Sequence, residues 1–123
     1  MIAAGGSAGG HLATAIYTTP GCDSEEDDLS ISPKPNLFVL YNPVLDATRR
    51  PERFASAEVS MACSPLHNMD GDMPPALLMY GTEDLFMEDG KQYIQEARSL
   101  GLPAFDVYIE CPELFSRDGH QMA

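Results

Sequence analysis

Two runs of this chain are apolar at every position, and they constrain its fold more than any other feature. They cover residues 37–41 and 76–80, and Asn42-Pro43 and Gly81 end them. A strand with one face in water alternates apolar and polar residues, whereas a continuous apolar run suits a strand covered on both faces, as in a parallel sheet. We therefore expect a parallel sheet in which both faces need a covering layer.

Helical patterns separate these runs from two shorter apolar segments, so that strands and helices alternate along the chain. Such an alternating order is typical of the α/β class with right-handed crossovers. The sequence therefore predicts an α/β fold with about four parallel strands and flanking helices. The expected strands are residues 2–4, 37–41, 76–80 and 105–109, and the expected helices are 11–18, 88–100 and a weakly patterned one within 48–60.

Residues 88–100 carry the clearest helical pattern. Gly101 follows them, at the position where a glycine commonly ends a helix. The apolar stripe of this helix consists of Tyr93, Ile94, Ala97 and Leu100. In the helix expected at 11–18, the apolar residues on one face are Leu12, Ala15 and Ile16. Both patterns have the spacing of helices that bury one side.

The chain has 123 residues, of which 44% are hydrophobic, which suits one domain over residues 1–123. Asp and Glu number 19 against 7 Lys and Arg, so the net charge is −12. Nucleic acids and anionic membrane surfaces bind basic patches, so neither is an expected partner. No apolar run approaches the ~20 residues that cross a bilayer, and the N-terminus lacks a secretory signal. We expect a cytoplasmic protein as the chain stands, whereas a longer parent could be secreted.

The cysteines and the acidic loop predict no metal site. The chain has an odd number of cysteines, Cys22, Cys63 and Cys111, and no pair of them has CxxC spacing. Both features argue against a disulfide framework or a structural zinc site. The acidic loop after Cys22 alternates carboxylates as calcium loops do. Its sixth position is Asp28 instead of Gly, however, and its twelfth is Lys34 instead of Glu. We expect a solvated loop, and neither a metal nor a cofactor.

The segment Gly5-Gly6-Ser7-Ala8-Gly9 lies between the first expected strand and the first expected helix. It matches G-x-S-x-G, the nucleophile elbow of α/β-hydrolases, in which a serine occupies a sharp, strained turn. The glycines let neighbouring backbone pass without Cβ clashes. The helix N-terminus directs its amides toward charge that develops beside the serine oxygen. Ser7 is therefore the candidate nucleophile, and the alternative is a glycine-rich turn without catalytic meaning.

Two nucleotide-binding motifs do not fit the same glycines. A P-loop needs Lys followed by Ser or Thr after its last glycine, and here His11-Leu12 follows. No register of residues 5–10 supplies the dinucleotide pattern G-x-G-x-x-G.

Asp84 is the candidate acid. It lies in Gly81-Thr82-Glu83-Asp84, directly after the apolar run 76–80. The carboxyl ends of parallel strands form the ligand-binding edge of an α/β sheet, where an aspartate can orient a histidine and stabilise its imidazolium. The alternatives are a helix cap or a solvated turn residue, and Glu83 is the neighbouring competitor.

His120 is the one histidine that fits the chain order Ser…Asp…His of this class. His11 is too close to Ser7 and is interpreted as a structural residue of the first helical turn, and His67 precedes Asp84. The alternative for His120 is a histidine of the chain terminus without a catalytic role.

Several further segments carry a recognisable pattern in a fixed order. They are Gly5-Gly6-Ser7-Ala8-Gly9-Gly10-His11-Leu12-Ala13, Ser32-Pro33-Lys34-Pro35-Asn36, Leu40-Tyr41-Asn42-Pro43-Val44-Leu45-Asp46, Ser64-Pro65-Leu66-His67 and Pro74-Pro75-Ala76-Leu77-Leu78-Met79-Tyr80-Gly81-Thr82-Glu83-Asp84. Together they resemble the esterase/lipase-like α/β-hydrolases, in the branch that holds acetyl-xylan esterases and bifunctional feruloyl/acetyl esterases. The resemblance covers roughly residues 2–110.

This resemblance implies a Ser-Asp-His triad on Ser7, Asp84 and His120, with the Ala8 amide as one half of the oxyanion hole. It also implies a truncated α/β-hydrolase domain, from the elbow strand to the region of the catalytic histidine. Family members carry about four strands before the elbow, including a His-Gly-Gly-type loop that supplies the other oxyanion amide. Their His-Gly-Phe-Phe-like sequence after the last strand is absent here, and His120 comes late.

The expected function is that of a serine carboxylesterase acting on a small ester or an acylated carbohydrate. The alternative is an inactive remnant of such an esterase that acts at most as a binding module. By itself the chain is expected to be a weak catalyst, because one oxyanion donor is missing. It is also expected to self-associate through a sheet face that the absent helices would cover.

Overall fold

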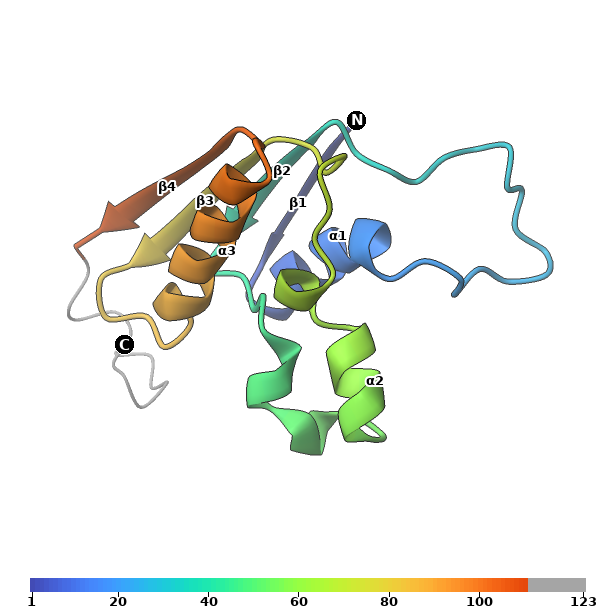
Figure 1. The fold of residues 1–123 in the computed structure, drawn as a ribbon, viewed down its shortest axis with the longest axis horizontal. Coiled ribbons are helices and arrows are strands. Elements are labelled where there is room, and N and C mark those ends of the chain that lie inside the picture. Colours follow the sequence, from blue (N-terminus) through green and yellow to red (C-terminus); the bar gives the residue numbers. More distant parts are fainter. Residues whose placement is uncertain (111–123) are drawn as a thin grey trace.

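The computed structural model describes residues 1–110; Cys111 and His120 lie outside them. Figure 1 shows strands and helices alternating along the chain. The strands are β1 (Ile2–Gly6), β2 (Leu37–Tyr41), β3 (Ala76–Gly81) and β4 (Ala104–Ile109). The helices are α1 (Ala8–Thr18), α2 (Ala57–Ala62) and α3 (Met87–Ser99), and the short 3₁₀ turns are η1 (Ala47–Arg49), η2 (Pro51–Arg53) and η3 (Pro65–His67). These bounds confirm the predicted α/β order.

The four strands form one parallel sheet in the order β1-β2-β3-β4. Each strand therefore pairs with the one that precedes it in the sequence. All carboxyl ends lie at the same edge, and the turns that carry Ser7 and Asp84 leave the sheet there. The predicted parallel sheet is confirmed. Successive side chains of each strand point alternately to one face of the sheet and to the other.

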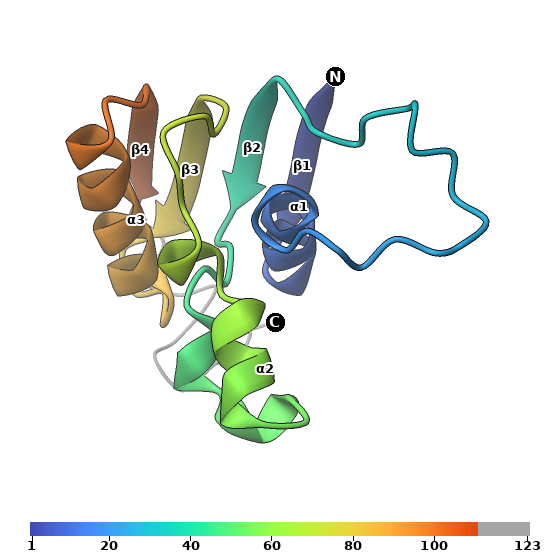
Figure 2. The same cartoon turned by 45° about the vertical axis from the view of Figure 1, so that its right-hand side comes forward.

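One face of the sheet is covered by α1 and α3, which lie on the same side of the strands (Figure 2). The buried core gathers on this face, because alternate strand residues point toward the helices. Its largest members from the sheet and α3 are Phe38, Leu40, Leu78, Tyr80, Tyr93 and Ile94. The predicted stripe of α3 is thus confirmed in Tyr93, Ile94 and Ala97, and Gly101 has the positive φ, 75°, expected after a helix.

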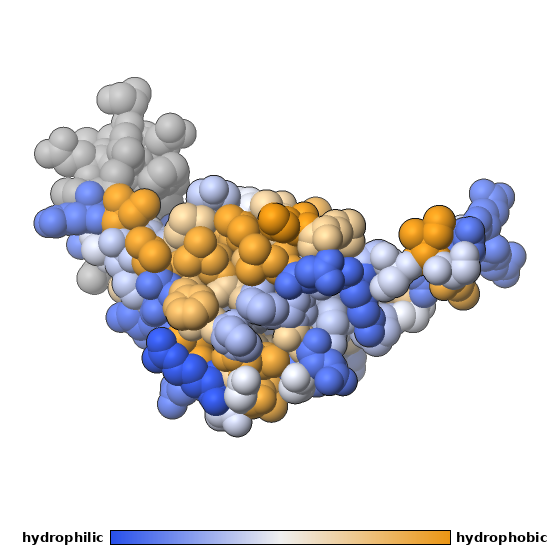
Figure 3. All heavy atoms as spheres, turned by 90° about the horizontal axis from the view of Figure 1, so that it is seen from above, coloured by the Kyte–Doolittle hydropathy of each residue, from blue (hydrophilic) through white to orange (hydrophobic). Residues whose placement is uncertain are grey.

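The opposite face remains open within residues 1–110. Its exposed side chains include Tyr41, Phe105, Val107 and Ile109, which are 46–64% exposed. A space-filling view from above shows hydrophobic side chains gathered over the middle of the molecule (Figure 3). The apolar runs predict that both faces of the sheet are covered. Within the described residues, helices cover only one of them.

Helix α1 forms as predicted but buries a different face. Leu12 and Ile16 are exposed, whereas Gly10, Ala13 and Thr14 are buried. The helix lies so close to the chain beyond β2 that a Cβ on Gly10 would stand 2.6 Å from Pro43 Cβ. The buried Thr14 hydroxyl donates to the Gly10 carbonyl oxygen at 2.8 Å, which satisfies its hydrogen bond inside the helix.

Two segments of the chain lie outside this core. Residues 19–36 form an acidic arm that projects beyond α1 (Figure 1). After β2 the chain forms η1, η2 and α2 below the sheet, where the sequence predicts only weak helicity. None of the helices in residues 1–110 is long and apolar enough to cross a membrane.

Candidate functional site

Ser7 occupies the sharp turn between β1 and α1. Its backbone has φ 53° and ψ −118°, a conformation that L residues other than glycine rarely adopt. The Ser7 N–H donates to the Tyr41 carbonyl at 2.9 Å, and the Ser7 carbonyl accepts from the N–H groups of His11 and Val44 at 3.2 Å. These bonds fix the turn from both sides, while the Ser7 side chain is exposed and does not cap α1. The strain predicted from G-x-S-x-G is thus present at Ser7.

Gly5 permits the close approach of strand and helix at this turn. A Cβ on Gly5 would stand 2.4 Å from the backbone carbon and oxygen of Gly9, so any side chain there would force the two apart. Gly9 differs, because a Cβ on it meets no atom within 4 Å. The packing of the turn therefore requires glycine at position 5, whereas position 9 has space for a side chain.

Ala8 is the first residue of α1. The first N–H groups of a helix have no acceptor within it, and they stand at the positive end of the helix dipole. The Ala8 amide adjoins Ser7, where an oxyanion donor belongs. Its role in the oxyanion hole stays a prediction.

Asp84 lies in the turn between β3 and α3, at the same edge of the sheet as Ser7. Its carboxylate oxygen Oδ1 accepts from the Phe86 N–H at 2.7 Å, which fixes the side chain on its own turn. Burial raises the pKa of the Asp84 carboxyl, and the Phe86 N–H partly offsets this shift. Strand β2 separates the two turns, and strand spacing places β1 and β3 about 10 Å apart. The serine and aspartate side chains, with one imidazole between them, can together span a backbone separation of that order.

The sequence did not reveal a charged cluster beside the Asp84 turn. Asp89, in the first turn of α3, is fully buried, and Arg49 Nε of η1 lies 3.0 Å from its Oδ1. Arg49 Nε also lies 3.8 Å from Oδ2 of Asp46, which caps η1 through the Thr48 N–H. Besides this ion pair, the Asp46 backbone N–H favours the charged form of the Asp89 carboxyl. The pair links the segment after β2 to the helix after Asp84.

Burial raises the pKa of the Asp89 carboxyl to about 6. Arg49 lowers it, and the nearby carboxylates Asp46 and Asp84 raise it further. A sequence signal for Asp89 did exist. It precedes Tyr93 by four residues and so extends the buried stripe of α3, which places an acid where an apolar residue is usual. Asp46 and Arg49 lie in an irregular segment and carry no such periodic signal.

The two described histidines are engaged away from Ser7. His11 Nε2 lies 2.7 Å from the Cys63 carbonyl oxygen, and its ring packs edge-on against Phe54. His67 Nδ1 lies 2.8 Å from Ser64 Oγ and 3.7 Å from Asp46 Oδ1. His11 therefore ties α1 to the end of α2, as a structural residue would. The expected partner of Ser7 and Asp84, His120, falls outside residues 1–110.

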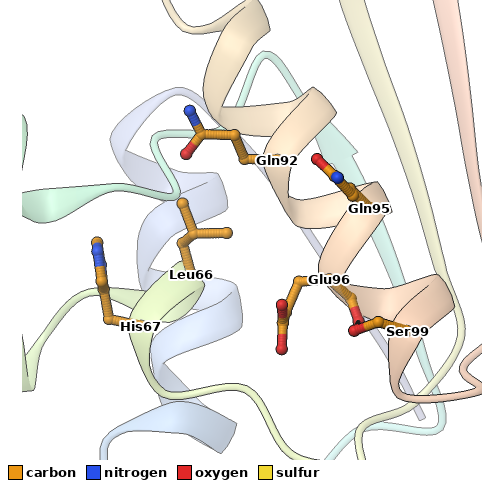
Figure 4. A pocket seen from close by; sticks show the side chains of 6 residues that line it. All are labelled: Leu66, His67, Gln92, Gln95, Glu96 and Ser99. Carbon is orange, nitrogen blue, oxygen red and sulfur yellow. Dashed lines mark hydrogen bonds between the residues drawn. The ribbon is translucent and has the colours of Figure 1, made fainter.

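Two grooves of the described surface lie away from the Ser7 and Asp84 turns. One of about 460 Å³ separates η3 from α3, and its side chains face one another across the gap (Figure 4). A second, of about 400 Å³, lies between α3 and β4. Ser7 and Asp84 line neither. Within residues 1–110 no group of three acidic, histidine or cysteine side chains could hold a metal ion.

Solved structures of esterase 2 from the planctomycete Thermogutta terrifontis are similar to this chain. The form phosphoramylated by tabun has 31% identity and a TM-score of 0.78 over 89% of this chain and 42% of its own. The form phosphorylated by paraoxon has 32% identity and a TM-score of 0.77 over 89% of this chain and 41% of its own. The propionate-bound form has 30% identity, a TM-score of 0.75, and coverage of 89% and 44%.

This chain therefore spans about two fifths of the length of those esterases. Its four parallel strands and flanking helices match a part of the α/β-hydrolase fold, as the sequence predicts. No family model matches the chain. No curated protein matches it either.

Proposed function

We propose that this chain carries the nucleophile and the acid of a serine carboxylesterase. The observation that supports this most is the backbone of Ser7, held at φ 53° between a parallel strand and a helix with its side chain exposed. Strain of this kind costs about 1–3 kcal/mol and persists where the surroundings enforce it, often at functional sites. The similar structures named above are of an esterase, which supports the same chemistry.

In the proposed reaction, Ser7 Oγ attacks the ester carbonyl while the imidazole of His120 accepts its proton. The Ala8 N–H donates to the oxyanion of the tetrahedral intermediate. The imidazolium then protonates the leaving alcohol, and Asp84 holds the ring in position. Water, activated by the same imidazole, hydrolyses the acyl-serine and releases the acid.

We propose short-chain acyl esters, including acylated carbohydrates, as the substrate class. The resemblance to acetyl-xylan and feruloyl/acetyl esterases supports the carbohydrate. The similar esterase was solved with propionate and with butyrate bound, which supports a short acyl group. We place the described elements and the proposed triad in one domain, residues 1–123.

An organophosphate tests the nucleophile without requiring turnover. Paraoxon should add one diethylphosphoryl group, which intact-mass spectrometry and peptide mapping should locate on Ser7. Ser7→Ala should abolish the adduct, whereas Ser32→Ala, in the exposed arm, should leave it unchanged. His120→Ala should slow labelling, since it removes the proposed base.

Turnover of a short-chain nitrophenyl ester separates the two interpretations of the sequence. Labelled Ser7 with measurable turnover supports the esterase. A correctly folded chain that neither labels at Ser7 nor hydrolyses the ester would overturn the proposal in favour of an inactive remnant.

A further inference from the structure

The segment that follows β2, residues 42–49, leaves the sheet between the Ser7 turn and the Asp84 turn. Its contacts with the Ser7 turn are made by backbone and by close packing. The Val44 N–H donates to the Ser7 carbonyl at 3.2 Å, and α1 packs closely against Pro43. The position of this segment therefore determines one side of the Ser7 turn.

The same segment contacts the strand and the helix that flank Asp84. The buried hydroxyl of Tyr80, in β3, donates to the Pro43 carbonyl at 2.9 Å. The Tyr80 ring also lies under the first turn of α3, where a Cβ on Gly90 would stand 2.2 Å from the ring carbon Cε2. Tyr80 thus packs α3 against β3 and joins both to residues 42–49.

A second connection runs through the fully buried carboxylate of Asp89, in the first turn of α3. Arg49 Nε lies 3.0 Å from its Oδ1, and the Asp46 N–H favours its charged form. The Asp89 N–H donates to the Phe86 carbonyl at 3.1 Å, and the Phe86 N–H donates to Asp84 Oδ1 at 2.7 Å. A continuous set of contacts therefore leads from η1 to the Asp84 carboxylate.

We propose that Asp89 is a positioning residue: paired with Arg49, it holds α3 against residues 42–49 and so fixes the spacing between the Ser7 turn and the Asp84 turn. This role rests on the proposed function, in which Asp84 orients the imidazole that serves Ser7. An apolar pair of similar volume often stabilises a fold as well as a buried ion pair does. An acid on the apolar stripe of α3 is therefore better explained by positioning than by stability alone.

Turnover of a short-chain nitrophenyl ester by the full chain tests the effect on catalysis. Asp89→Asn should lower kcat by about 10- to 10²-fold, the range for a misplacement of up to 1 Å, and leave KM unchanged. The loss should stay below that of Asp84→Asn, because Asp89 acts through Asp84. Glu88→Gln is the matched control and should keep full activity, since this neighbouring acid is exposed and lies 3.4 Å from Lys91 Nζ.

The ion pair itself is tested by combining variants. If Asp89 and Arg49 act as one unit, Arg49→Met should lower kcat by about the same factor as Asp89→Asn. The double variant should then lose no more than either single variant. Losses that multiply in the double variant would show two independent effects and overturn the pair as the positioning device.

Amide hydrogen exchange measures the spacing of the turns without requiring activity. Asp89→Asn should speed exchange of the Phe86 and Val44 N–H groups by about tenfold, because each loses part of its support. The Phe38 N–H, which donates to the Pro75 carbonyl at the other edge of the sheet, should change by less than about twofold. Equal acceleration at all three sites, or acceleration at Phe86 alone, would overturn the proposal.

The two measurements separate this proposal from the proposed function. Faster exchange at Val44 and Phe86 in a protein whose wild type neither labels at Ser7 nor hydrolyses the ester supports the link between the turns and overturns the esterase. An active wild type in which Asp89→Asn loses no more kcat than Glu88→Gln overturns the positioning role alone. If Asp89→Asn fails to fold, Tyr80→Phe replaces it. This variant removes only the hydroxyl on the Pro43 carbonyl, and unchanged kcat and Val44 exchange would then overturn the proposal.

Discussion

The two turns that carry Ser7 and Asp84 leave the same edge of one sheet but hold their side chains by different means. At Ser7 the backbone does the positioning: a positive φ, three main-chain hydrogen bonds and a glycine that lets two segments touch. At Asp84 a hydrogen bond from the Phe86 N–H holds the side chain, and the ion pair of the buried Asp89 with Arg49 ties the adjoining helix α3 to η1. The Ser7 turn thus depends on steric fit, whereas the attachment of the helix after Asp84 depends on a buried ion pair, so the two regions should respond to different perturbations.

The largest expected effect is steric and lies at the Ser7 turn. Gly5→Ala places a Cβ 2.4 Å from the Gly9 backbone, and overpacking against main chain should lower the free energy of unfolding by at least about 3 kcal/mol. Gly9→Ala meets open space inside α1 and should raise it by about 0.5–1 kcal/mol. Urea unfolding measures both. Equal effects would show that the turn is not closely packed.

The next effect is electrostatic and depends on pH. Because the folded pKa of Asp89 is raised to about 6, the folded state binds more protons than the unfolded state between about pH 4 and 6. This carboxyl therefore stabilises the fold at low pH, and its contribution falls as pH rises through that window. Asp89→Asn should remove the slope, which amounts to about 2–3 kcal/mol. Unfolding free energies of both proteins at pH 4, 5, 6 and 7 test this, and parallel curves would contradict it.

Removal of the cation should cost somewhat less. Arg49→Met leaves Asp89 buried without its partner, and breaking a buried pair costs about 3–5 kcal/mol. Because the Arg49 side chain is 42% exposed, we expect about 2 kcal/mol at pH 7. Arg50→Met, at an exposed neighbour, should change stability by less than about 0.5 kcal/mol. If Arg49→Met combined with Asp89→Leu is as unstable as Arg49→Met alone, the loss does not come from the unpaired carboxylate.

The smallest effect on stability is expected at the acid itself. Asp84→Asn keeps an oxygen that can accept from the Phe86 N–H, so unfolding should change by less than about 1 kcal/mol. Ester hydrolysis should nevertheless fall by roughly 10³–10⁴-fold, since the imidazolium loses its counter-charge. Glu83→Gln should retain activity. A loss at Glu83 with none at Asp84 would reverse the assignment.

The same contrast explains what the sequence could predict. Strands and the Ser7 turn follow from apolar runs and glycine spacing, which are local patterns with a direct steric meaning. The buried face of α1 was not predictable from its apolar residues. Because Gly10 has no side chain, the helix packs closely against Pro43 with the face that carries its small residues. The Asp46–Arg49–Asp89 cluster joins positions forty residues apart through irregular structure. No periodicity links such residues, and only the fold brings them together.

Because each strand pairs with its predecessor, the sheet can grow one strand at a time as the chain leaves the ribosome. The Ser7 turn is synthesised before β2, yet it cannot form its hydrogen bonds at that stage. The Ser7 N–H donates to the carbonyl of Tyr41, and the Ser7 carbonyl accepts from the N–H of Val44, so both partners must be synthesised before the turn is held. The strained backbone therefore forms only after the acidic arm and β2 have emerged. A stalled nascent chain in which Tyr41 is still inside the exit tunnel should hold Ser7 in an ordinary, unstrained conformation.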